Sequence, residues 1–163
     1  MDAVSGQTIS LSAYKTKKGV LLIFTSNYCP YSKLYEGRIS RLEQSYPDVQ
    51  VILINPNNPQ ASESDSFEEM QKKAKDEAYT VPYLADKDQK IATLLGASKT
   101  PEVFLLRPGA NGYAVVYSGA LDDNPQVEND VHESYVDMAI KELIDGVNTI
   151  KNKRPIGCMI KKY

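Results

Sequence analysis

Residue types that bind metals or drive hydrolysis are scarce in this sequence, which has one histidine, two cysteines and no tryptophan among 163 residues. Cys29 and Cys158 lie too far apart for the local pairs that most zinc sites use, so no metal site is expected. A hydrolase with a histidine base would depend on His132 alone, and a solvated helix position explains that residue better. Of the reactions that these few residues could support, thiol chemistry is the most natural.

Excess charge and long apolar runs are absent too. The formal net charge is -2, whereas nucleic-acid-binding proteins usually carry a basic stripe, so no nucleic-acid partner is expected. The longest apolar run, Val20–Phe24, is far shorter than the roughly 18 residues of a membrane span, so no span is expected. Met1–Gly6 lacks the features of a signal peptide. Localisation stays open: cytoplasmic as written, periplasmic if a signal peptide was removed.

The chain is expected to form one domain. Its length suits a single core, and its 42% hydrophobic content is that of an ordinary globular protein. We expect residues 1–163 to form this domain, with residues 147–163 as an irregular, basic C-terminal tail. The sequence favours no particular oligomeric state.

Two continuous apolar runs, Gly19–Phe24 and Val49–Ile54, predict strands that are covered on both faces. Apolar residues at helical spacing from Tyr31 to Tyr46 predict a helix between them, and hence a parallel, right-handed crossover. The later predicted elements are a helix from the Ser66–Glu69 capping box to Ala78, an extended segment at 81–84, a helix at 88–95, strands at 102–106 and 113–117 joined by a hairpin, and a helix from Asp130 to Gly146. This order predicts an α/β fold of thioredoxin type, with a central mixed sheet flanked by helices.

Cys29 follows the first predicted strand and directly precedes a helix. Pro30 suits the first helical position, where its missing N–H costs nothing. At a helix N-terminus, free backbone N–H groups and the helix dipole favour a thiolate over a thiol. The alternative is a small buried hydrophobic residue, but its position outside the apolar run favours a reactive thiol.

Thr100-Pro101 begins the third core strand. Only about 5–6% of X–Pro bonds in folded proteins are cis, and a trans proline at a strand start is common. From these residues alone, the trans form is the expectation.

These motifs together resemble the thioredoxin-like superfamily. Within it, the chain is similar to the redoxin branch, which is grouped with alkyl hydroperoxide reductases and thiol-specific antioxidant proteins (AhpC/TSA). The motifs that carry the resemblance are Asn27-x-Cys29-Pro30-Tyr31-Ser32, Pro82-Tyr83-Leu84-x-Asp86, Thr100-Pro101, Tyr117-x-Gly119-x-x-Asp122-Asp123 and Gly157-Cys158-x-Ile160-Lys161. The resemblance implies that Cys29 is a nucleophile and that Pro101 is a cis-proline facing it.

The chain departs from the thioredoxin motif at two positions. Ser32 stands where thioredoxin has its second cysteine, and Tyr28 stands where the usual tryptophan precedes the first. A mixed disulfide on Cys29 must therefore be resolved by Cys158, if the tail folds back far enough, or by an external thiol. The Ser32 hydroxyl could donate a hydrogen bond to the Cys29 thiolate.

A thiol-disulfide oxidoreductase is the predicted function. Cys29 would attack a disulfide, Pro101 would shape the substrate groove, and Cys158 or an outside thiol would resolve the intermediate. The expected partners are protein or small-molecule thiols and disulfides, with peroxides as a further possibility, and no cofactor is expected.

Two other functions are left open by the sequence. A peroxiredoxin-like peroxidase would need a hydroxyl three residues before its nucleophile, which Ser26 supplies, and a proline seven residues before it, where Leu22 stands. Its arginine would be Arg38, Arg41 or Arg107. A thioredoxin-fold binding module without catalysis is the third hypothesis, and Ser32 is its best support.

Overall fold

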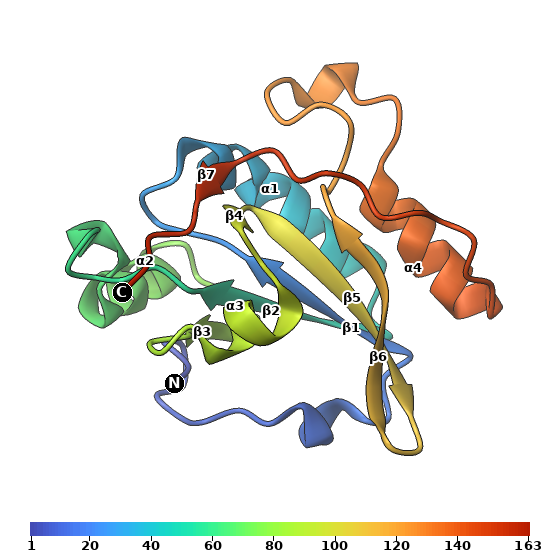
Figure 1. Ribbon diagram of the computed structural model, residues 1–163, viewed down its shortest axis with the longest axis horizontal. Coiled ribbons are helices and arrows are strands. Elements are labelled where there is room, and N and C mark those ends of the chain that lie inside the picture. Colours follow the sequence, from blue (N-terminus) through green and yellow to red (C-terminus); the bar gives the residue numbers. More distant parts are fainter.

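A mixed five-stranded sheet with the strand order β3-β2-β1-β5-β6 forms the middle of the molecule (Figure 1). The computed structural model describes residues 1–163. The strands of this sheet are β1 (Gly19–Phe24), β2 (Val49–Asn55), β3 (Tyr83–Ala85), β5 (Glu102–Gly109) and β6 (Gly112–Gly119). The first three run parallel to one another, and β5 and β6 add two antiparallel pairings. The predicted fold class is confirmed.

The central strand β1 is buried along its whole length because layers of side chains cover both faces of the sheet. Leu21 and Ile23 belong to one apolar cluster, whereas Leu22 and Phe24 belong to another on the opposite face. The helices are α1 (Pro30–Ser45), α2 (Phe67–Asp76), α3 (Lys90–Leu95) and α4 (Tyr135–Asp145). The first cluster holds side chains of α1, α2 and α4, and the second holds Ala92 of α3. None of these helices has the length and apolarity required to cross a membrane.

Local signals place the start of two helices correctly. Cys29 is the N-cap of α1 and Pro30 is its first helical residue. The hydroxyl of Ser66 accepts a hydrogen bond from the Glu69 N–H at 3.3 Å and caps α2. Both starts depend on residues within three positions of one another in the sequence, which is why the sequence predicts them.

The predicted start of the last helix at Asp130 is wrong. The chain forms a 3₁₀ turn at Glu128–Asp130, and α4 begins only at Tyr135. Asp123 explains the delay, because its carboxylate accepts the His132 N–H at 3.0 Å and its own N–H donates to the Glu133 carbonyl at 3.1 Å. These bonds hold residues 132–133 against the preceding turn, so His132 is not on a helix.

The C-terminal tail, residues 147–163, contains little regular structure but packs against the rest of the domain. Figure 1 shows it crossing one end of the sheet after α4. Lys153 forms a bridge with Gly119, and β7 (Cys158–Met159) pairs antiparallel with β4 (Lys99–Thr100). Ile160 is buried in the core cluster of α3. The tail therefore packs on the domain rather than extending into solvent.

The tail lies close against β6 at Gly119. A Cβ added there would overlap the carbonyl group of Lys153, and the backbone has φ +129. Gly112, at the other end of β6, has φ +130, but a Cβ there would meet nothing within 4 Å. Comparing substitutions at Gly112 and Gly119 therefore distinguishes the cost of backbone strain, which both share, from the loss of the contact with the tail, which occurs only at Gly119.

We predict that Gly119→Ala lowers the free energy of unfolding by more than Gly112→Ala does. Both substitutions incur backbone strain of about 1–3 kcal/mol, but only Gly119→Ala pushes Lys153 away. Urea denaturation of the two variants measures the difference. Limited proteolysis should cut the tail faster in Gly119→Ala alone. Equal losses of stability would contradict this account.

Candidate active site

Cys29 and Cys158 are joined by a disulfide, with their Cα atoms 5.9 Å apart. Cys29 is completely buried, whereas Cys158 is partly exposed. The sulfur of Cys29 also lies 3.0 Å from the carbonyl oxygen of Thr100. The sequence left open whether the tail reaches Cys29, and the structure brings the two cysteines together.

The Thr100–Pro101 peptide bond is cis, so the resemblance is correct here and the expectation from the residues alone is wrong. Thr100 lies opposite Cys158 in the pairing of β4 with β7. A Cβ at Gly157 would overlap the carbonyl group of Thr100. Only a residue without a side chain fits there, and this close approach seats Cys158 over Cys29.

The other predicted shell residues surround this pair in different ways. Ser32 is fully buried and its hydroxyl has no hydrogen-bond partner in the disulfide form. Tyr28 is 56% exposed, and the Lys161 ammonium lies 5.6 Å from the centre of its ring. Pro30 is exposed and Tyr31 is half-buried. Tyr28 therefore contributes to the surface around the disulfide, whereas Ser32 lies beneath that surface.

Ser26 faces a buried carboxylate. The Ser26 hydroxyl donates to both carboxylate oxygens of Asp65 at 3.0 Å. The Ser26 Oγ also accepts hydrogen bonds from the backbone N–H groups of Tyr28 and Cys29, at 3.1 and 3.2 Å. Ser26 thereby fixes the backbone that leads into α1. Its own proton is directed toward Asp65.

Asp65 lies at the centre of a buried network that the sequence analysis missed. Its carboxylate accepts hydrogen bonds of 2.6–3.0 Å from Ser26, Asn27, Asn55, Asn57 and Ser62. Asn57 in turn accepts the N–H of Lys161 at 2.8 Å, which ties the tail to the same network. The cluster of asparagines after β2, at the sheet edge that also carries Ser26, is the signal that could have found it.

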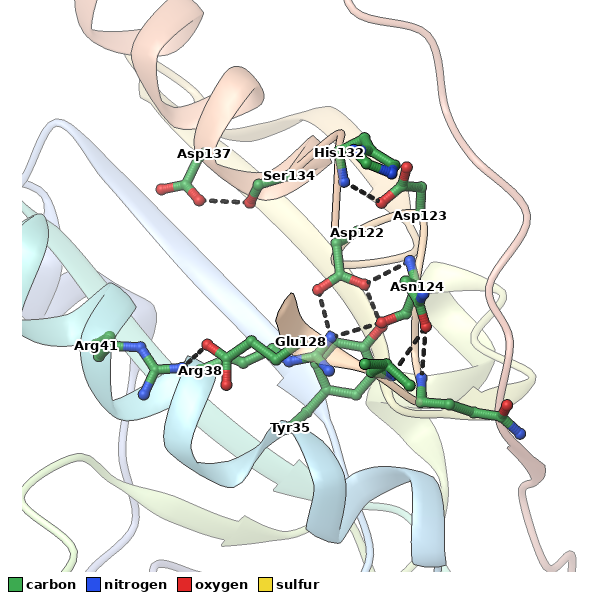
Figure 2. A network of polar contacts seen from close by, with 12 residues as sticks. Tyr35, Arg38, Arg41, Asp122, Asp123, Asn124, Glu128, His132, Ser134 and Asp137 are labelled. Atoms are coloured by element: carbon green, nitrogen blue, oxygen red, sulfur yellow. Dashed lines mark hydrogen bonds and ion pairs between the residues drawn. The ribbon is translucent and has the colours of Figure 1, made fainter. Parts of the chain in front are cut away.

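A second polar cluster lies along α1, on the side facing residues 121–137 (Figure 2). Arg38 donates to the Asp122 carboxylate at 2.7 Å and to the Asn124 carbonyl at 2.8 Å, and Tyr35 donates to Asp122 at 2.6 Å. Burial, and then the bond to the Asp122 carboxylate, raise the pKa of Tyr35. Arg38 is nine positions beyond Cys29 (38 minus 29), about 13 Å along a helix. This cluster therefore anchors the loop after β6 and lies apart from the cysteines.

A cavity of about 330 Å³ adjoins this cluster. Arg41 forms an ion pair with Glu128 at its edge. No group of three or more histidine, cysteine or acidic side chains in residues 1–163 is arranged to hold a metal ion. The Asp122 carboxylate instead accepts hydrogen bonds from Tyr35 and Arg38.

Comparison with known proteins finds one matching family model and several similar solved structures. The model of the AhpC/TSA family matches residues 1–126, a range that includes Cys29 and Pro101 but not Cys158. No curated protein matches the chain.

Solved structures extend the comparison to the tail. A hypothetical protein from Sinorhizobium meliloti is 30% identical, with a TM-score of 0.88 over 99% of this chain and 88% of that chain. An uncharacterized conserved protein from Geobacillus kaustophilus is 29% identical, with a TM-score of 0.90 over 100% of this chain and 87% of that chain. A secreted disulfide oxidoreductase of Mycobacterium tuberculosis has the same fold at 18% identity, with a TM-score of 0.56 over 71% of this chain and 78% of that chain.

We predict that Asp65→Asn weakens the Cys29–Cys158 disulfide as well as the fold. The NH₂ group of the new asparagine would face hydroxyl and N–H groups that are themselves hydrogen-bond donors. We therefore expect the free energy of unfolding to fall by about 2–3 kcal/mol. Loss of one hydrogen bond to the tail, through Asn57, should lower the equilibrium constant of the disulfide about tenfold. A glutathione redox titration measures that constant.

Asp122→Asn is the matched control for this experiment. It also alters a buried carboxylate, but one that contacts Tyr35 and Arg38 rather than the loop before Cys29. It should lower stability and leave the disulfide equilibrium unchanged. Equal effects of both variants on that equilibrium would show that Asp65 has no special connection to the cysteines.

Proposed function

The chain belongs to the AhpC/TSA family, and on this basis we propose that it is a thiol-disulfide oxidoreductase in which Cys29 is the nucleophile and Cys158 the resolving thiol. The observation that carries the proposal is the disulfide between these residues. It joins a cysteine at a helix N-terminus to a tail cysteine seated beside a cis-proline.

The reaction begins with the reduced protein. The N-terminus of α1 favours the thiolate of Cys29, which attacks a substrate disulfide and forms a mixed disulfide while one substrate thiolate leaves. Cys158 then attacks the Cys29 sulfur and releases the second substrate thiol. The substrate disulfide gains two electrons, and the two cysteines lose them by forming the bond seen in the structure.

Cys158 takes the role that Ser32 cannot perform. A serine hydroxyl does not form a disulfide, although it lies where thioredoxin has its second cysteine. The antiparallel pairing of β4 with β7 instead places Cys158, which lies 129 positions after Cys29 in the sequence, within bonding distance of Cys29. The partners supported by this arrangement are protein or small-molecule thiols and disulfides.

The surroundings of Cys29 give less support to a peroxidase. Ser26 would have to offer its hydroxyl to a peroxide, but it donates to Asp65. Of the arginines considered, Arg38 and Arg41 pair with Asp122 and Glu128, and Arg107 lies far along β5 from the cis-proline. These contacts favour exchange of disulfides over reduction of peroxides.

We predict that Cys29→Ser reduces a protein disulfide such as insulin no faster than the assay's dithiothreitol does alone. Cys158→Ser should instead accumulate a mixed disulfide on Cys29, visible by mass spectrometry, because nothing resolves it. The double variant Cys158→Ser/Ser32→Cys should regain turnover and serves as the control for folding. Rapid peroxide consumption that depends on Cys29 would favour the peroxidase instead.

We further predict that the thiol of Cys29 has a pKa below the free value of about 8.5 in the reduced protein. The N-terminus of α1 stabilises the thiolate, so alkylation should already be fast below that pH. The rate of reaction of Cys158→Ser with iodoacetamide, measured against pH, gives the midpoint. Cys29→Ser, in which only Cys158 reacts, should show a midpoint near the free value. A Cys29 midpoint at or above that value would argue against its role as nucleophile.

A further inference from the structure

The two cysteines of the disulfide are not equally exposed. Cys29 has no exposed surface, and its sulfur is already in contact with the carbonyl oxygen of Thr100. Cys158 is partly exposed and is flanked by Ile156 and Met159, which are 50% and 57% exposed. An incoming thiolate can approach Cys158 from solvent, but it can reach Cys29 only after the tail moves.

The leaving groups also differ. Attack on one sulfur of a disulfide expels the other as a thiolate, and the better-stabilised thiolate leaves faster. Cys29 caps a helix of 16 residues. The N–H groups of Tyr31 and Ser32 have no acceptor in the structure, and the Ser32 hydroxyl has no partner. These donors at the start of α1 can receive negative charge that develops on the Cys29 sulfur. Cys158, in the short strand β7, has no such helix behind it.

We propose that the electron donor of the oxidised protein, a thiol or dithiol, attacks the sulfur of Cys158 and expels the thiolate of Cys29. This proposal rests on the proposed function. The new bond joins the donor sulfur to Cys158, and the Cys29–Cys158 bond breaks. A second thiol of the donor then attacks the donor's own sulfur and releases Cys158, so the donor leaves as a disulfide and both cysteines are reduced.

The two half-reactions therefore use different sulfurs and different surfaces. The donor meets Cys158 on the outer side of the tail while β7 is still paired with β4. The substrate meets Cys29 only once the tail has lifted. Exposed Met159 and Ile156 lie beside the first of these sites and form part of the surface that the donor contacts.

Mapping the first adduct tests the proposal directly. The oxidised full-length protein is mixed with excess reduced glutathione, quenched with acid at successive times, alkylated and analysed by peptide mass spectrometry. Glutathione adducts of Cys29→Ser and Cys158→Ser provide the reference masses. Extrapolated to zero time, the adduct should lie on Cys158 and the free thiol on Cys29. An adduct on Cys29 from the outset, or none on either cysteine, would overturn the proposal.

Gly157→Ala tests whether coverage by the tail sets this preference. Its Cβ would overlap the Thr100 carbonyl group and push the tail away, so the share of adduct on Cys29 should rise. Gly37→Ala in α1 is the control, since its Cβ would meet only the Arg41 side chain, at 3.5 Å, and the share should not change. An unchanged share in Gly157→Ala would contradict the role of the tail.

The experiment also separates this proposal from the one on which it rests. Absence of a Cys29–Cys158 disulfide in the oxidised protein would refute the resolving role of Cys158. A disulfide that forms but is opened at the Cys29 sulfur would refute only the present inference.

Discussion

Hydrogen bonds to the Asp65 carboxylate hold together segments that no regular element connects. They come from the loop after β1, from the end of β2 and from the turn before α2. Asn57 extends the same network to the backbone of Lys161 in the tail. A buried carboxylate whose donors are all neutral is costly unless nearly every lone pair is satisfied, and here that requirement fixes the position of the chain on both sides of the disulfide.

The sequence predicts the features that depend on neighbouring residues. The unbroken apolar run of β1 indicates a strand covered on both faces, and Pro30 indicates a helix that starts after Cys29. Features set by contacts between distant residues were missed or left open. Asp123 delays α4 through bonds to residues 132–133, and Asp65 gathers partners from separate loops. The pairing of Cys29 with Cys158 depends on β4 and β7, each only two residues long.

The buried pair of Arg38 and Asp122 has a different role from the network around Asp65. It fastens the loop after β6 to the middle of α1. Such a pair contributes to the position of a segment more than to net stability, because removing two charges from water offsets most of their attraction. The network around Asp65 thus reaches the tail through Asn57, whereas the Arg38–Asp122 pair holds the loop after β6.

The disulfide also changes the topology of the chain. It closes a covalent ring over a sequence separation of 129 residues, and the central strand β1 lies outside this ring. Such a ring restricts the denatured ensemble so strongly that, by the chain-entropy model, closing it raises the free energy of unfolding by about 5 kcal/mol at 25 °C. Reduction of this disulfide therefore also lowers the free energy of unfolding, and the lifetime of the protein under proteolysis or heat depends on the redox poise of its surroundings.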